Sequence, residues 1–331
     1  MKRLAYKNIL FSIPFIFLFL SCARDDIESV ETFTGIDLLE ESTSLSVNEA
    51  VLQYMLRYRY LVIGVVENDQ TVLTRSFGSD HLNDREQYAS VSKPVTANIC
   101  FQLWQDGMIN SLLDPISDYD EKYADAQPDE YSDPKISFVH LLTHTSGVVH
   151  LDDLWKKGKL NMLFSPGRNT EYSTKGFGIL GDVMETIAGE KYSLLVDKYI
   201  SEPINGSSFY CYPLVQTTPG AGILSDIEDF ANFARASMDG TYYPRDFLIE
   251  TVLQPYSESP NGTIGLGWFV LEHEGRMLGY HAGSNGKPRA FILIDPENQS
   301  AIVLLGRNYE EKAKTDLHIL ALDVLNIVNY L

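Results

Sequence analysis

The pattern of hydrophobic and polar positions predicts strands near both ends of the chain and helices between them. Residues 60–66 and 71–77 are rich in β-branched and aromatic residues and are joined by four polar residues, which predicts a hairpin. Residues 46–57 and 317–331 carry apolar positions at helical spacing. Residues from 90 to about 254 read as helices broken by loops. Later strands are predicted at residues 264–271, 277–281, 290–294 and 301–305.

This order of elements predicts an α+β fold. Both ends of the chain would supply one antiparallel sheet flanked by terminal helices, and the middle would form a large, mostly helical insertion. We expect the folded domain to cover residues 45–331, with its sheet part at about 45–89 and 260–331 and its helical part at about 90–259. A cleft is expected where the insertion meets the sheet.

The first 21 residues have the pattern of a signal peptide. A basic start precedes a 12-residue apolar run from Ile9 to Leu20, which is shorter than the ~20 residues that cross a bilayer as a helix. Residues 19–22 (Phe-Leu-Ser-Cys) resemble a bacterial lipoprotein box, in which Cys22 is lipidated. We therefore expect an exported lipoprotein, anchored in the cell envelope at the periplasm or outer membrane, with a tether over residues 22–44. Ordinary secretion with a free Cys22 is the alternative.

Composition and several incomplete motifs narrow the possible functions. The 331 residues carry a formal net charge of −19, which repels phosphate backbones and argues against nucleic acid as a partner. Residues 176–181 match G-x-G-x-x-G, but the residues before them are too polar for the buried strand of a dinucleotide site, so we expect helix packing there. His140 and His144 lie four apart without completing a zinc pattern. No metal and no organic cofactor is predicted.

The candidate chemistry begins with Ser90 and Lys93, which lie three apart where a helical pattern opens. This spacing puts both side chains on one helix face. A serine hydroxyl becomes a good nucleophile only when a base takes its proton, and a lysine in a desolvated cleft can lose its own proton near neutral pH. The helix N-terminus also offers free N–H groups to a developing oxyanion. Such a pair alone arises often by chance.

Further stretches appear in a fixed order along the chain. With them, the sequence resembles the serine β-lactamase and penicillin-binding-protein superfamily, in particular class C β-lactamases and the related esterases and D-amino-acid peptidases. The resemblance covers about residue 45 to the C-terminus and implies the same two-part fold. The stretches are residues 88–97 (YASVSKPVTA), 106–109 with 113–115, 141–147 (LLTHTSG), 165–167 leading to 172–174 (YST), 221–225 (AGILS), 265–268 (GLGW) and 280–284 (YHAGS).

The resemblance also implies roles for individual residues. Ser90 matches the acylated nucleophile and Lys93 its partner in the first motif. Tyr172 matches a tyrosine that acts as general base with the lysine. An ordinary phenol has a pKa of ~10, so this role requires nearby cationic groups that favour its anion. The backbone N–H groups of Ser90 and Ser284 would form the oxyanion hole.

Two departures from the family pattern bear on the substrate. Thr174 replaces an asparagine that helps to hold a substrate amide. His281, in the His281–Gly283 stretch that replaces Lys-Thr-Gly, turns a fixed positive charge for a substrate carboxylate into a titratable one. Thr174, His281 and Gly283 are the expected substrate-binding residues. Both departures weaken the β-lactamase interpretation and favour a small-ester or peptide hydrolase.

We therefore expect a serine hydrolase that works through an acyl-enzyme at Ser90. Its substrate would be a small ester, a D-amino-acid-containing peptide or a β-lactam, in that order. The alternative is a non-catalytic protein on the same fold that binds cell-wall peptide or a β-lactam. Two further residues are expected to be structural: His144 would hold a loop beneath the cleft, and Trp268 would pack where sheet and helices meet.

Overall fold

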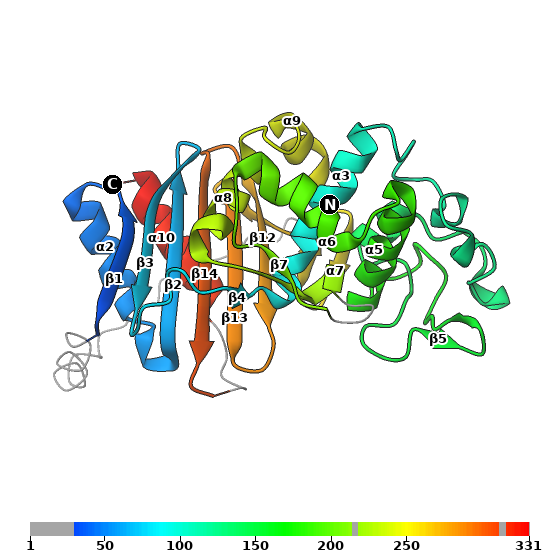
Figure 1. Ribbon diagram of the computed structural model, residues 1–331, viewed down its shortest axis with the longest axis horizontal. Coiled ribbons are helices and arrows are strands. Elements are labelled where there is room, and N and C mark those ends of the chain that lie inside the picture. The colour runs from blue at the N-terminus through cyan, green and yellow to red at the C-terminus, as the bar shows by residue number, and fades with distance from the viewer. Residues whose placement is uncertain (1–29, 214–217, 311–315, 331) are drawn as a thin grey trace, which may run out of the picture.

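The protein, described by a computed structural model over residues 30–213, 218–310 and 316–330, is built on a nine-stranded antiparallel sheet (Figure 1). Both ends of the described chain contribute strands, which confirms the predicted α+β fold. The predicted signal peptide and Cys22 lie outside the described residues. In order across the sheet the strands are β1 (Thr32–Asp37), β3 (Gln70–Phe77), β2 (Tyr58–Glu67), β14 (Ser300–Asn308), β13 (Pro288–Asp295), β12 (Arg276–Ser284), β11 (Phe269–His273), β10 (Gly262–Ile264) and β9 (Ser257–Ser259).

Helices cover both faces of this sheet. The helices α2 (Glu41–Leu52) and α10 (Leu317–Tyr330) pack on one face, and α8 (Ile227–Met238) packs on the other (Figure 1). Alternate residues of β2 therefore enter two different apolar cores: Ile63 lies beneath α2 and α10, and Val62 faces the helical part. Within the described part of the chain, no helix is long and apolar enough to cross a membrane.

The helical part lies between β3 and β9 in the chain. Trp268, only 1% exposed, belongs to its core, which confirms the predicted packing role. Its helices are α3 (Ser92–Gln105), α4 (Phe138–Leu142), α5 (Thr174–Ala188), α6 (Tyr192–Val196), α7 (Thr218–Ala221), α8 and α9 (Arg245–Phe247). Its short strands are β4 (Glu86–Gln87), β5 (Trp155–Lys156), β6 (Lys159–Leu160), β7 (Tyr210–Cys211) and β8 (Ile223–Ser225).

The structure differs from the sequence-based expectation at the start of the domain. The expected tether over residues 22–44 contains strand β1, which pairs with β3, and α2 begins at Glu41 rather than at residue 46. An edge strand pairs on one side only, so β1 can be largely exposed and needs no hydrophobic alternation. Asp37 at its end pairs with the buried Arg75 of β3, which holds the edge strand in place.

The G-x-G-x-x-G match packs helices together, as predicted. Its residues lie in α5, which ends at Gly189 with the left-handed φ of +67°. A Cβ on Gly181 would come within 2.2 Å of the Pro219 side chain, so glycine lets α7 approach α5 closely. The two cysteines of the described chain, Cys100 and Cys211, are both free.

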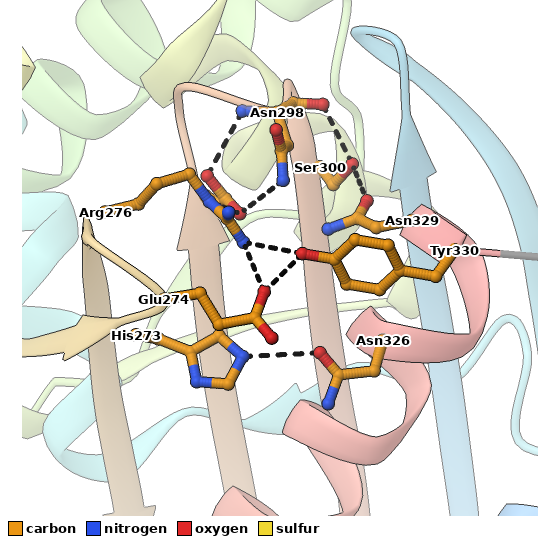
Figure 2. Close-up of polar contacts among 9 residues, drawn as sticks. His273, Glu274, Arg276, Asn298, Ser300, Asn326, Asn329 and Tyr330 are labelled. Carbon is orange, nitrogen blue, oxygen red and sulfur yellow. Dashed lines mark hydrogen bonds and ion pairs between the residues drawn. The ribbon is translucent and has the colours of Figure 1, made fainter.

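A polar network fastens the C-terminal end of α10 to the turns of the sheet (Figure 2). The fully buried Asp295 accepts hydrogen bonds from Arg276 Nε and Asn298 Nδ2, each at 3.1 Å. Ser300 donates to Asn329 of α10 at 2.8 Å, and Arg276 contacts Tyr330. The network fixes where α10 lies over the sheet.

Asp295→Ala tests this attachment. The substitution removes the buried acceptor of Arg276 Nε and Asn298 Nδ2, while Arg276 keeps its ion pair with Glu274. Loss of hydrogen bonds to a charged group costs about 2 kcal/mol. We expect the free energy of unfolding, measured by urea denaturation, to fall by about that amount. Glu297→Ala removes an exposed carboxylate from the same turn and should change it by less than about 0.5 kcal/mol. Equal effects of the two changes would contradict the role assigned to Asp295.

Candidate active site

Ser90 lies in a strained turn that leads directly into α3. It belongs to a 3₁₀ turn, Ala89–Val91, in which Ala89 has a φ of +46°, a conformation that is costly for any residue except glycine. Two hydrogen bonds to β8 hold the turn: Tyr88 N donates to Ile223 O at 2.9 Å, and Ile223 N donates to Ser92 Oγ at 3.0 Å. The serine is thus presented from a backbone fixed on both sides.

Lys93 lies one turn further along and is fully buried. Its Nζ donates to Gly220 O at 2.8 Å and to Thr174 Oγ1 at 3.2 Å, and it lies 4.6 Å from the centroid of the Tyr172 ring. The two hydrogen-bond partners are neutral oxygen atoms. Burial lowers the pKa of Lys93 well below its ordinary value, because desolvation disfavours the ammonium form.

Tyr172 precedes α5 and is positioned by two histidines. Ser173 N donates to His144 Nδ1 at 3.0 Å, and Thr174 N donates to His150 Nδ1 at 3.2 Å. The imidazole of His144 also packs against the Tyr172 ring, with ring centroids 4.4 Å apart. These contacts confirm the predicted structural role of His144, and burial lowers its pKa well below the usual range. No pattern in the sequence indicated that His150 would also position the backbone beside Tyr172.

The side chains of Ser90 and Tyr172 line the same cavity. Burial raises the pKa of Tyr172, and a polar interaction with the Ser90 side chain opposes this shift. The neutral phenol is therefore the favoured form in the free protein. The expected phenolate, which required neighbouring cations, is not favoured, because desolvation also disfavours the ammonium form of Lys93.

His281 lies on β12 and is 2% exposed. Burial, together with the nearby Lys93, lowers its pKa to about 3. Its Nδ1 lies 3.1 Å from Ala282 O, and since a carbonyl oxygen only accepts, Nδ1 carries the proton. His281 is therefore neutral at physiological pH. The titratable charge expected here from the sequence is removed by burial.

Gly283 brings β12 unusually close to the turn that carries Ser90. A Cβ at this position would lie 2.0 Å from Tyr88 O and 3.4 Å from the Ala89 Cβ. Only glycine allows this approach, because the nearest atom belongs to backbone and cannot move aside. The backbone amide of Ser284 is thereby held beside the strained turn.

One cavity of about 590 Å³ collects most of the predicted site residues. Ser90, Tyr172, His281, Gly283 and Ser284 all line it. Thr174 does not: it is 4% exposed, and its hydroxyl is taken up by Lys93. Its predicted contact with substrate is therefore replaced by a contact with the lysine.

Ser90 and Tyr172 line the cavity, and Lys93 lies behind the Tyr172 ring. The sequence that carries these residues matches a known family. The Beta-lactamase family matches residues 49–325. The chain belongs to the β-lactamase family. This confirms the resemblance seen in the sequence to serine β-lactamases and penicillin-binding proteins.

Solved structures agree with this assignment. A class C β-lactamase superposes with a TM-score of 0.71 at 16% identity, covering 87% of this chain and 96% of that one. A penicillin-binding protein homologue from Pyrococcus abyssi superposes with a TM-score of 0.71 at 18% identity, covering 86% and 77%. At this level of identity the likeness shows the β-lactamase fold alone.

The curated relatives include one that is named as an esterase. Esterase EstB from Burkholderia gladioli is 26% identical over 195 residues, which are 47% of this chain and 48% of the esterase. Across three curated relatives, the matched stretches make up 43% to 60% of the relatives' lengths. The family thus includes relatives named as β-lactamase-like proteins and as an esterase.

The buried histidine of this β-lactamase-family site should make the fold sensitive to acid. An unfolded histidine titrates near ~6.5, whereas His281 in the folded protein titrates at about 3. Between these values the unfolded chain binds a proton that the native protein does not, so stability falls as pH falls, by up to about 1.4 kcal/mol per pH unit. His281→Gln should reduce the slope of unfolding free energy against pH by that amount, measured in urea from pH 7 to 4.

A matched change controls for the loss of a histidine as such. His273 is only half-buried, on β11, and His273→Gln should leave the slope closer to that of the native protein. If both variants reduce the slope of unfolding free energy against pH equally, the burial of His281 is not the cause of that slope.

Proposed function

We propose that the protein is a serine hydrolase that cleaves carboxylic esters through an acyl-enzyme on Ser90. The observation that carries the proposal is the arrangement of three side chains: Ser90 and Tyr172 line one cavity and interact there, and the Tyr172 ring lies against the buried Lys93. A hydroxyl nucleophile needs a base within reach. Among the described residues, Tyr172 and Lys93 are the candidate bases next to Ser90, the cavity serine that lies at the start of a helix.

The pKa directions suggest how the proton moves. Burial shifts Lys93 toward its neutral amine and Tyr172 toward its neutral phenol. As Ser90 Oγ bonds to the ester carbonyl carbon, its proton passes to Tyr172, and Tyr172 gives its own proton to Lys93. This step requires Lys93 Nζ, which lies over the ring 4.6 Å from its centroid, to move to the hydroxyl. The bond to the alkoxy oxygen then breaks, and that oxygen leaves as the alcohol with the proton returned through Tyr172. Water repeats the sequence and releases the acid.

The close approach at Gly283 supports an oxyanion hole. The amides of Ser90 and Ser284 lie on the two backbone segments that Gly283 brings together. Donors held in advance at the place where charge develops stabilise the tetrahedral intermediate without reorganisation. Glycine at 283 is therefore part of the proposed catalytic geometry.

An uncharged ester suits this site better than a β-lactam or a D-amino-acid peptide. The family's lysine for a substrate carboxylate is His281 here, and burial keeps it neutral. The protein as a whole carries a net charge of −19, which repels anionic substrates. The esterase among the relatives supports the same choice.

The rate of p-nitrophenyl acetate hydrolysis by the full chain tests the proposal. Ser90→Ala should reduce kcat to the buffer rate, a loss of at least about 10³-fold. Lys93→Arg keeps a long basic side chain but stays protonated and cannot yield a neutral amine, and should cost at least about 10²-fold. In the native enzyme, activity should fall as pH falls through the lowered pKa of Lys93, because protonation removes the base. Equal rates for the native protein and Ser90→Ala would favour the non-catalytic binding protein.

Gly283→Ala tests the oxyanion geometry separately. The new methyl group must push β12 away from Tyr88, which separates the two amides, and loss of one oxyanion donor costs about 10² to 10³ in kcat. Gly275→Ala adds a methyl group in a turn where no atom lies within 4 Å of it and controls for general strain. If Gly283→Ala remains folded by thermal melting and keeps kcat within about twofold, the oxyanion hole lies elsewhere.

A further inference from the structure

The cavity beside Ser90 extends to the opposite face of the sheet. Successive side chains of β12 point to opposite faces of the sheet. His281 and Gly283 face the helical part, and Tyr280, Ala282 and Ser284 face the side that carries α10. Residues of both sets line the cavity, together with Leu317 and other residues of α10. β11 pairs with β12 only as far as Tyr280, so the strand edge beyond it is free. The cavity passes around this free edge.

The end of the cavity at α10 is apolar. The helix α10 packs on β13 and β14, and the space beside it over β11 and β12 remains open. Leu271, which pairs with the core residue Leu278, is 37% exposed there although it is a large aliphatic side chain. The apolar side chains that line this end are Phe269, Leu271, Phe291, Leu293, Leu317 and Leu322.

The described residues that line the cavity offer few groups that can carry a charge. Among the described residues around the cavity, none is lysine, arginine, aspartate or glutamate, and the two histidines are His281 and His318. His281 donates its Nδ1 proton to backbone and is buried. A group carrying a full charge would lose its hydration here without gaining a partner. The network around Asp295 fastens the C-terminal end of α10, the helix whose first turns line the cavity (Figure 2).

We propose that this end of the cavity binds an uncharged apolar group of the ester, which makes the enzyme selective for medium-chain over acetyl or charged esters. The proposal rests on the ester hydrolysis proposed above. A volume of about 590 Å³ lies within the range of small-molecule pockets, which are mostly apolar with few polar groups at the reacting end. The apolar group is held either as the acyl chain or as the alcohol.

Two ester series identify the group. p-Nitrophenyl esters from acetate to octanoate vary the acyl chain, and alkyl acetates from ethyl to octyl, followed by pH-stat, vary the alcohol. Burial of one methylene is worth up to about fourfold, so kcat/KM should rise by about two- to fourfold per methylene in one series. A rise in either series supports the proposal and names the group. Rates that are Ser90-dependent but independent of chain length in both series overturn it.

Substitutions at Leu271 locate the binding site. Leu271→Asp and Leu271→Arg both place a charge at the apolar end, and each should lower the ratio of octanoate to acetate kcat/KM by at least about tenfold. Only the arginine can pair with a substrate carboxylate. Leu271→Arg should therefore raise the rate with the p-nitrophenyl half-ester of octanedioic acid relative to octanoate, and Leu271→Asp should not.

Leu113→Asp provides the matched control. Leu113 is 74% exposed and lies outside the cavity lining, so its ratio of octanoate to acetate rates should match that of the native protein. If Leu271→Asp and Leu271→Arg also keep that ratio, the apolar group binds elsewhere and the proposal is wrong. Failure of the proposed function gives a different result, since hydrolysis would then be equally fast in Ser90→Ala.

Discussion

The burial of Lys93 is the constraint on which the rest of this site depends. Desolvation of a lysine among neutral oxygen atoms costs much more free energy for the ammonium form than for the neutral amine. Its Nζ reaches Gly220 O and Thr174 Oγ1, so α3, α5 and α7 must all converge on it. The protein therefore contains a buried polar group, and burial shifts Lys93 toward the amine form that can act as a base for the serine.

Convergence of three helices at one point requires small residues at the contacts. Gly181 lets Pro219 of α7 come against α5, and an added Cβ on Gly220 would meet Thr174 at 2.8 Å. Gly283 serves the same purpose on the sheet side, where it admits the Tyr88 carbonyl. These three glycines thus have one physical role: each lets two neighbouring elements approach more closely than a side chain would allow.

Much of this arrangement could be predicted from the sequence, because it depends on local pattern. The hairpin predicted over residues 60–66 and 71–77 is formed by β2 and β3, because runs of β-branched and aromatic residues joined by a polar turn mark such a pair. Strand β1 could not be predicted, because an exposed edge strand lacks the alternation that marks buried strands. The sequence also could not show that Thr174 would face Lys93, or that burial would neutralise His281. The Thr174–Lys93 contact and the burial of His281 both depend on which helices and strands pack together, and the spacing of residues along the chain does not predict that packing.

The neutral lysine and the uncharged cavity are two consequences of one electrostatic condition. A substrate carboxylate near Lys93 would favour the ammonium form, because an opposite charge at short range in a poorly solvated site raises a lysine pKa. The base would then be protonated by the act of binding. A permanently charged cation could pair with the carboxylate and so leave the pKa of Lys93 unchanged. His281 is neutral, however, and the described residues that line the cavity include no lysine or arginine. An uncharged substrate leaves the lysine as it is in the free protein. The same burial that makes Lys93 a base thus also selects against charged esters.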